Sequence, residues 1–389
     1  MSRIGIIAEF NPLHLGHKYL IDEAKALGEC VCVISSNFVQ RGDTAIFEKR
    51  VRTQMALDTA ADLVLELPVC YSMSTAQNFA LGSVFALVSA GCDTLIFGSE
   101  AGEVSPLLKT AEILNSKEFE ERLQKRLKRG VTFAKARQIT AEECGAPKGI
   151  LEGANNNLAI EYITAAKNLG CEINFKTVKR QGAGHDSETA EGGFASASLI
   201  REKIISGDFG FAKKYMPENA FSLLNENNIS DINRLDRAVL ASLRTKTLDE
   251  LESLPDVSEG LHNKLFSEIK VATSLFGVYN GVKSKRYTLA RVRRIVLSAF
   301  LGLDNGFFMQ TPPYVRVLGF NTVGKGIIRE MRKKDNCNLV LKTNEIKKLG
   351  DRAQKMLDIE SVATDLYMLS LKKAGECSLE YKAKIIKTE

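Results

Sequence analysis

Short apolar runs alternate with longer amphipathic segments through the first half of the chain. Four apolar runs, each four to six residues long, have the length and composition of buried strands: residues 4–9, 30–35, 62–67 and 94–97. Three intervening segments carry apolar residues at helical spacing: residues 16–27, 49–61 and 76–90. This alternation of apolar strands with helices predicts an α/β fold with a Rossmann-like, doubly wound parallel sheet.

The pattern changes after the fourth apolar run. Residues 104–138 predict helix, with opposite charges at helical spacing, which is typical of a solvated face. A strand is predicted at residues 171–178, and beyond about residue 205 the spacing is helical, apart from a strand-and-helix excursion near residues 315–341. We therefore expect an α/β domain at residues 1–205 and a mainly helical, basic domain at residues 206–389.

Composition places the chain among ordinary globular proteins. Of its 389 residues, 44% are hydrophobic and 26% are charged. There is no apolar run of bilayer length and no secretory signal pattern. The eight cysteines form no Cys-x-x-Cys pair, which argues against a zinc site or a disulfide framework. We expect a cytoplasmic protein that has no membrane contact.

Positive charge is concentrated in the second half. The net charge is +6, but residues 281–350 hold fifteen Lys and Arg against four Asp and Glu. Interleaved aromatic residues, such as Tyr287 and Phe308, could stack on unpaired bases, so this segment favours a nucleic-acid partner. A solvated helical face is the alternative. Three arginines of the segment are the predicted contacts with RNA: Arg291, Arg293 and Arg294.

The first strand runs into a turn with two of the four histidines, His14 and His17, on either side of Gly16. A strand that ends at a helix N-terminus presents backbone N–H groups and the helix dipole to an anion. Imidazoles there can donate to phosphate oxygens, and a glycine allows close approach. The sequence therefore predicts a nucleotide phosphate site, although a histidine can also serve as a simple helix cap.

Other polar loops follow the neighbouring strands. The second strand ends at residues 35–37 and the fourth at Gly98 and Ser99. Ligands of such folds sit beyond the carboxyl ends of the strands, so these loops should converge on the histidine turn. Arg41 follows the second strand and could bind a phosphate or lie on a surface turn.

A second phosphate-binding turn is predicted at residues 194–201. Ser196 or Ser198 could cap a helix and donate to a phosphate, while Arg201 would neutralise its charge. The alternative is a simple serine cap. Together with the histidine turn, this segment completes an arrangement that could hold a triphosphate from two sides.

These two turns, residues 10–17 and 198–201, resemble those of the nucleotidyltransferase superfamily related to class I aminoacyl-tRNA synthetases. Five further segments resemble, more narrowly, the tRNA(Met) cytidine acetate ligase family: residues 9–12, 37–42, 61–68, 97–100 and 180–185. The resemblance implies an enzyme that makes acetyl-adenylate from ATP and acetate and then acetylates the wobble cytidine of elongator tRNA(Met). Mg²⁺ is expected to accompany ATP.

The resemblance also implies site residues. The catalytic groups would be His14, His17 and Arg201. The ATP contacts would be Ile7, Ala8, Glu9, Phe10, Asn11, Pro12, Leu13, His14, Leu15, Gly16, His17, Lys18, Tyr19, Leu20, Gly98, Asn155, Arg180 and Ser198. Asn155 precedes a helical stretch at residues 158–169, where asparagine is also a good N-cap.

Two other functions remain open on the residues alone. A small-molecule adenylyltransferase would use the same histidine turn without needing a basic second half. A non-catalytic RNA-binding protein could carry a degenerate nucleotide fold, although the presence of His14, His17 and Arg201 argues against this.

Overall fold

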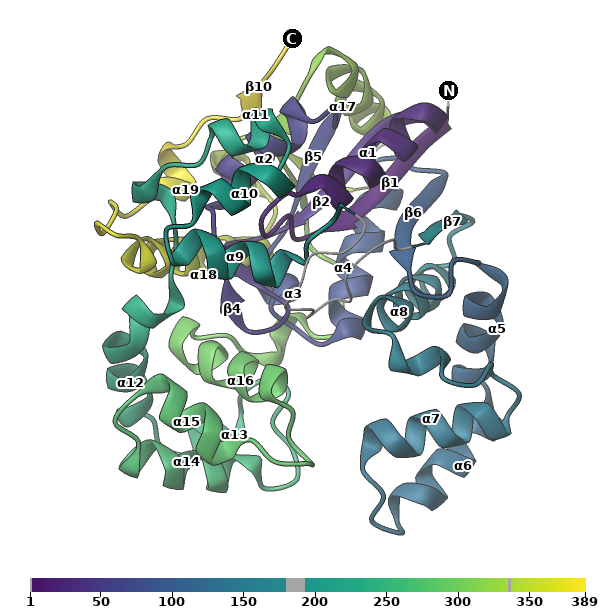
Figure 1. Ribbon diagram of the computed structural model, residues 1–389, viewed down its shortest axis with the longest axis vertical. Helices are drawn as coiled ribbons and strands as arrows, with labels where there is room; N and C mark the ends of the chain where they lie inside the picture. Colours follow the sequence, from purple (N-terminus) through teal and green to yellow (C-terminus); the bar gives the residue numbers. More distant parts are fainter. Residues whose placement is uncertain (1, 180–192, 335–336) are drawn as a thin grey trace.

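The computed structural model describes residues 2–179, 193–334 and 337–389. A central sheet, mostly parallel, runs through the molecule (Figure 1). Its strands are β1 (Ser2–Ala8), β2 (Gly28–Ser35), β5 (Leu63–Leu67), β6 (Thr94–Ser99), β7 (Asn174–Lys179), β8 (Val315–Phe320), β9 (Leu339–Val340) and β10 (Ile386–Lys387). They follow the order β10-β8-β5-β2-β1-β6-β7, with β9 beside β8, while β3 (Phe38–Val39) and β4 (Asp43–Thr44) form a separate pair.

Strand direction decides which loops meet. Strands β1, β2, β5, β6 and β7 are mutually parallel, with Ile4 of β1 opposite Cys30 of β2. Their carboxyl ends therefore lie at one edge of the sheet, which we call the carboxyl edge. Strand β8 runs antiparallel to β5, so its chain direction is reversed relative to this edge.

Both faces of the sheet are covered, which explains why its strands are continuously apolar. On β2, Cys30 and Cys32 point into one core cluster, whereas Val31 and Val33 point into the other. Helices α1 (Leu15–Leu27) and α2 (Lys49–Asp58) contribute to the first cluster. Helices α4 (Ala76–Ser89) and α8 (Ala154–Asn168) contribute to the second. The predicted α/β class with a doubly wound sheet is confirmed.

Two helical projections extend from the carboxyl edge and stand opposite each other in Figure 1. The first, which we call the arm, consists of α6 (Lys117–Leu127) and α7 (Phe133–Glu143), joined to the sheet through α5 (Ser105–Leu114). The second, the lobe, contains α12 (Asp236–Arg244), α13 (Leu248–Glu252), α14 (Leu261–Val271), α15 (Leu275–Val282) and α16 (Leu289–Leu301). The helical stretch expected at residues 104–138 is thus three helices.

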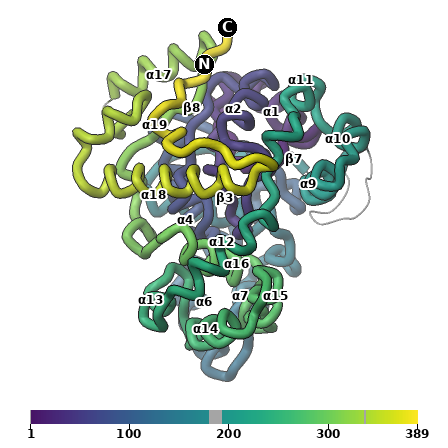
Figure 2. The backbone as a smooth tube through the Cα atoms, turned by 90° about the vertical axis from the view of Figure 1, so that its left-hand side faces the viewer, coloured from purple at the N-terminus to yellow at the C-terminus, as the bar shows by residue number. Residues whose placement is uncertain are grey.

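The remaining helices surround the sheet. They are α3 (Val69–Ser72), α9 (Ala197–Ile205), α10 (Phe209–Tyr215), α11 (Glu218–Ser222), α17 (Thr322–Lys334), α18 (Asp351–Tyr367) and α19 (Leu379–Lys382). Figure 2 shows α18 and α19 returning across the body of the molecule near the start of the chain. Within the described ranges, no helix combines the length and apolar character needed to cross a bilayer.

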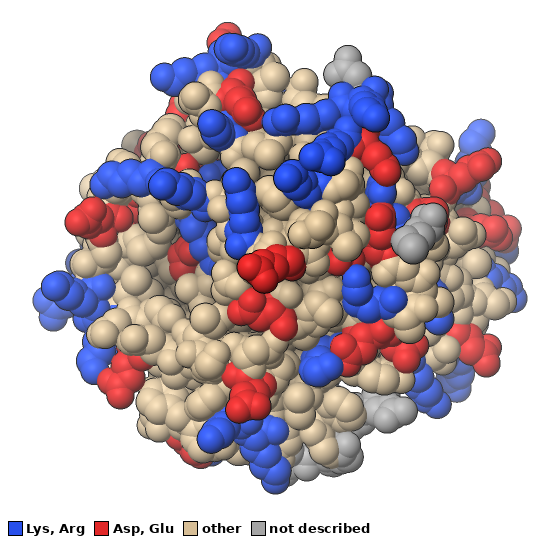
Figure 3. All heavy atoms as spheres, turned by 90° about the horizontal axis from the view of Figure 1, so that it is seen from above, with Lys and Arg blue, Asp and Glu red and all other residues tan. Residues whose placement is uncertain are grey.

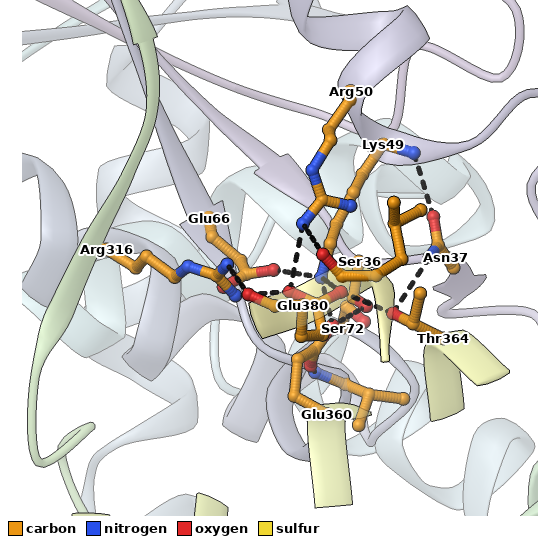
Figure 4. Close-up of polar contacts among 12 residues, drawn as sticks. Ser36, Asn37, Lys49, Arg50, Glu66, Ser72, Arg316, Glu360, Thr364 and Glu380 are labelled. Carbon is orange, nitrogen blue, oxygen red and sulfur yellow. Dashed lines mark hydrogen bonds and ion pairs between the residues drawn. The ribbon is translucent and has the colours of Figure 1, made fainter. Parts of the chain in front are cut away.

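A buried ionic cluster ties this C-terminal return to the sheet (Figure 4). Lys49 of α2 lies 2.6 Å from Glu360 of α18 and 2.7 Å from Glu380 of α19, and it also pairs with Glu66 of β5. Arg316 of β8 contacts Glu66 at 3.3 Å and Glu380 at 2.5 Å. The cluster therefore joins elements on both sides of residue 205, and the division of the chain there stays a prediction.

Candidate active site

The turn between β1 and α1 is supported by buried residues. Phe10 is buried and has a φ of 45°, which residues other than glycine adopt rarely. The side chain of Asn11 accepts a hydrogen bond from the backbone N–H of Ile46 at 2.8 Å. Residues 10–13 are all buried, so they form the support on which the exposed part of the turn rests.

The two histidines lie at the start of α1. His14 is the N-cap, and its Nδ1 accepts the backbone N–H of Gly16 at 3.0 Å. The backbone N–H of His14 in turn donates to Nδ1 of His17 at 3.4 Å. Because both Nδ1 atoms are acceptors, each neutral ring carries its proton on Nε2, where it can donate to an anion. Capping and phosphate binding are therefore compatible here, one on each ring nitrogen.

Packing fixes the orientation of both rings. The imidazoles of His14 and His17 stack with centroids 3.9 Å apart, and the edge of Phe10 meets His17 at 5.2 Å. Gly16 leaves room for this arrangement, because a Cβ at that position would lie 2.9 Å from Cε1 of His14. The position of the His14 ring by itself therefore favours glycine here.

Helix α9 brings the second predicted turn against the first. Ser196 is its N-cap and accepts the backbone N–H of Leu199 at 3.1 Å. Arg201 donates from Nη1 to the carbonyl of Asn11 at 2.7 Å and from Nη2 to the hydroxyl of Ser198 at 3.1 Å. The structure therefore unites the His14–His17 turn with Ser198 and Arg201, although 190 residues separate Arg201 from Asn11.

The end of β6 meets the start of α8, which brings the segment of Gly98 near Asn155. The Glu100 carboxylate accepts the Asn155 side chain at 2.6 Å and the backbone N–H groups of Asn155 and Asn156 at 3.1 and 2.8 Å. Burial opposes ionisation of Glu100, but these hydrogen bonds outweigh it and lower its pKa. The expected asparagine cap is wrong in detail: Gly153 is the N-cap, and Glu100 satisfies the first turn from outside the helix.

Arg52 of α2 is a site residue that the sequence did not reveal. It is fully buried, and its guanidinium donates to the carbonyls of Phe47, Glu9 and Ser36 at 2.8, 2.6 and 2.7 Å. It thereby ties the ends of β1 and β2 to the loop that follows them. No local signal identifies it, because an arginine on an amphipathic helix ordinarily faces water.

The other predicted ATP contacts lie along β1 and α1. Ile7 and Ala8 end the strand, Glu9 follows it, and residues 15–20 form the first turns of the helix. Lys18 pairs with Asp22 at 2.5 Å, and Tyr19 is 41% exposed on the outer helical face. Arg180 and the family-like segment at residues 181–185 lie outside the described residues.

The structure gives the predicted RNA-binding arginines intramolecular partners. Arg291 donates to the carbonyl of Asp256 at 2.8 Å, and Arg294 pairs with the Asp256 carboxylate at 2.5 Å. Arg293 lies 4.0 Å from the Asp43 carboxylate and over the ring of Tyr279. The contacts with Asp256 hold α16 within the lobe, whereas the Arg293–Asp43 contact and a 3.4 Å hydrogen bond from Arg294 to the carbonyl of Gln40 dock α16 on the loop after β2.

The basic second half does not form one continuous surface. Helix α17 carries exposed Lys and Arg side chains at the edge opposite the lobe, where Arg3 of β1 pairs with Glu330 at 2.8 Å. Figure 3, which views the molecule from that side, shows Lys and Arg gathered on this face. The basic residues of the second half are therefore divided between two faces, and those of α17 lie on the face away from the carboxyl edge.

No metal centre emerges from the described part of the chain. Residues 2–179, 193–334 and 337–389 contain no group of three or more His, Cys, Asp or Glu side chains that could hold an ion. All eight cysteines are free thiols.

A mostly parallel sheet with stacked histidines at the first helix, clamped by a Ser-x-x-Arg turn, defines a nucleotidyltransferase of the HIGH type. The family model described as HIGH Nucleotidyl Transferase matches residues 1–381. A tRNA(Met) cytidine acetate ligase of Thermoanaerobacter sp. (strain X514) is 38% identical over the full length of both chains, and one of Clostridium novyi (strain NT) is 38% identical over 93% of this chain and 94% of its own. The chain belongs to the tRNA(Met) cytidine acetate ligase family.

Solved structures agree with this assignment. The crystal structure of apo Thermotoga maritima TmcAL superposes with a TM-score of 0.93 at 29% identity, covering 100% of this chain and 99% of that one. The same protein bound with alpha-thio ATP gives a TM-score of 0.91 at 28% identity with the same coverage.

Proposed function

We propose that this protein activates acetate with ATP and transfers the acetyl group to the wobble cytidine of elongator tRNA(Met). The observation that carries the proposal is the joined site at the carboxyl edge, where Arg201 of α9 binds the carbonyl of Asn11 in the turn that carries His14 and His17. Full-length similarity to acetate ligases, and the ATP analogue bound by the Thermotoga maritima relative, support this substrate set.

In the first step, a carboxylate oxygen of acetate attacks the α-phosphorus of ATP. A bond forms between that oxygen and phosphorus, the bond from phosphorus to the bridging oxygen breaks, and pyrophosphate leaves. Negative charge grows on the phosphate oxygens during the attack, so positioned N–H donors lower the barrier. His14 and His17 would donate from Nε2, and the N-terminus of α1 adds its dipole.

Arg201 would have two roles: it positions α9 against the histidine turn, and it neutralises charge on the triphosphate. Its two hydrogen bonds, to Asn11 and Ser198, anchor α9 against the histidine turn. A guanidinium stays charged at neutral pH, so Arg201 would also bring positive charge to the triphosphate. Mg²⁺ would accompany ATP as part of the substrate and would supply further positive charge to the phosphates.

In the second step, the exocyclic amine of cytidine attacks the acetyl carbonyl of acetyl-adenylate. The carbon–nitrogen bond forms, the bond from the acyl carbon to the phosphate oxygen breaks, AMP leaves, and the amine loses a proton. Proximity accounts for much of such a transfer, since both reactants are held on one surface. The carboxyl edge offers this surface between the arm and the lobe.

The direct test is acetate-dependent exchange of radiolabelled pyrophosphate into ATP without RNA, followed by transfer of labelled acetate to tRNA in acid-stable form. We expect both activities. Exclusive transfer of AMP to a small phosphorylated acceptor would support the adenylyltransferase alternative. Binding of tRNA without exchange or transfer would support the non-catalytic alternative.

A further inference from the structure

The arm begins and ends beside the proposed site. The chain leaves the carboxyl edge after β6, passes through α5, α6 and α7, and returns through the 3₁₀ turn η1 (Ile150–Glu152) to α8. Glu100, just after β6, binds the first turn of α8, so both ends of the excursion are fixed together. The arm is therefore anchored at the edge where acetyl-adenylate would form.

Positive charge is concentrated in one stretch of the arm, and the structure shows which of its cations pair with acids. Residues 122–141 contain seven Lys and Arg and no Asp or Glu. Three of these cations are paired with acids elsewhere: Arg122 with Glu118 at 2.7 Å, Arg126 with Glu143 at 2.5 Å, and Arg137 with Glu161 at 3.0 Å. These acids lie on α6, on α7 and on α8, where the arm joins the sheet. The cations without such partners lie nearer the loop that connects α6 to α7.

Four cations and one aromatic residue make up what we call the arm tip: Lys125, Lys128, Arg129, Phe133 and Lys135. All five are exposed, and the Phe133 side chain, at the first position of α7, is 58% exposed. Among the residues that the structure describes, none of the four cations has an ion pair or a side-chain hydrogen bond. The α6–α7 pair is held by buried Phe119, Leu123 and Ala136 instead.

We propose that the arm tip is an RNA-binding surface that contacts phosphates and one unstacked base of the tRNA substrate. The proposal rests on the proposed function and extends it by naming this surface. Exposed cations neutralise phosphates and release counterions, and an exposed aromatic ring between them provides a stacking platform for a base. Because the arm stands opposite the lobe at the carboxyl edge, an RNA that presents a base to the site would pass beside the arm (Figure 1).

The test compares two triple variants with the same change in charge. Lys128→Ala, Arg129→Ala and Lys135→Ala are combined in the arm variant. The control combines Lys325→Ala, Arg329→Ala and Lys333→Ala, three exposed residues of α17 at the opposite edge. With tRNA(Met) as the probe, we expect the arm variant to bind about tenfold or more weakly, and the slope of log affinity against log salt to fall by roughly 2. The control should stay near wild type.

A second variant separates stacking from charge. Phe133→Ala should weaken tRNA binding roughly fivefold or more without changing the salt slope, because no charge is removed. Phe133→Tyr keeps a stacking ring and should retain the affinity. The exposed position of Phe133 makes both substitutions compatible with the fold.

Pyrophosphate exchange without RNA distinguishes the possible outcomes. All arm variants should keep wild-type acetate-dependent exchange while their KM for tRNA rises. Loss of exchange in the arm variants would show a structural role and overturn the proposal. Wild-type tRNA affinity in the arm variant, together with weakened tRNA binding in the α17 control, would also overturn it. Equal weakening toward heparin and tRNA with an unchanged KM for tRNA would reveal a non-specific polyanion surface, which also overturns it. Absence of exchange in the wild type would reject the proposed function itself.

Discussion

At the scale of single residues, the proposed active site depends on side chains that have two roles at once. His14 caps α1 through Nδ1, which fixes the ring so that Nε2 is the donor. Arg201 holds the histidine turn through Asn11 while it carries a positive charge to the same place. Such double use keeps the donors oriented before a ligand arrives, so little reorganisation is needed during the reaction.

The two uses of His14 can be separated by substitution. Asparagine is an equally good N-cap, so His14→Asn should change the free energy of unfolding by less than about 0.5 kcal/mol, whereas His14→Ala should lose about 1 kcal/mol. Both variants should lose pyrophosphate exchange, because both lack the Nε2 donor. Urea denaturation and the exchange assay provide the two measurements. Retained exchange in His14→Asn would show that the ring is only a cap.

His17→Ala should abolish ATP-dependent turnover while the protein remains folded. The ring of His17 lies against Phe10 and His14 at the surface of the turn, so its removal leaves the buried support in place. Circular dichroism checks folding, and pyrophosphate exchange checks activity. An unchanged exchange rate would remove His17 from the mechanism.

At the scale of elements, buried ion pairs decide how helices and strands are joined. Glu380 of α19 shows this most clearly. Burial opposes its ionisation, but Lys49, Arg316 and Arg50 outweigh burial and hold the pKa of Glu380 well below its usual range. A carboxyl whose pKa is lowered on folding stabilises the protein above its ordinary pKa and loses this contribution as pH falls.

Glu380→Gln should therefore destabilise the protein most near neutral pH, by about 3 kcal/mol, because it removes a negative charge that both Lys49 and Arg316 contact in the buried cluster. The difference from wild type should shrink as pH falls below the ordinary glutamate value of 4.5, where the unfolded chain binds the proton first. Urea unfolding from about pH 7 to about pH 3 would measure it. A difference that stays constant over this range would contradict the assignment.

Helix α16 offers a test of the lobe as an RNA contact. Replacing Arg291, Arg293 and Arg294 with glutamine should weaken tRNA binding and flatten its salt dependence. Since Arg291 and Arg294 also bind Asp256, Asp256→Asn serves as the control: it weakens the internal contacts but keeps the three cations. If Asp256→Asn weakens binding as much as the triple variant does, the arginines act on the structure of the lobe and are not RNA contacts.

At the scale of the whole molecule, the end of the chain completes the sheet that the beginning starts. Strand β8 pairs with β5, and β10 pairs with β8, so residues after 205 extend the sheet. The Lys49 and Glu66 side chains find their buried partners on β8, α18 and α19. Catalytic core and C-terminal segment are therefore interdependent.

A fragment of residues 1–205 should consequently fail to fold cooperatively. It would expose the free edge of β5 and leave Lys49 and Glu66 without Glu360, Glu380 and Arg316. We expect a broad thermal transition and rapid proteolysis, against a sharp transition and resistance for the full chain. A sharp transition for the fragment would show that the first part folds by itself.

The sequence by itself determined which segments of the first half form strands and helices along the chain, because apolar periodicity and turn chemistry are local properties. It also located the His14–His17 and Ser198–Arg201 turns, whose residues carry a recognisable pattern. Only the tertiary structure decided what depends on distant partners: the burial of Arg52 and Lys49, the antiparallel orientation of β8, and which cations of the arm pair with acids. On a helix, a charged residue facing a core and one facing water have the same local spacing, so only the packed chain distinguishes them.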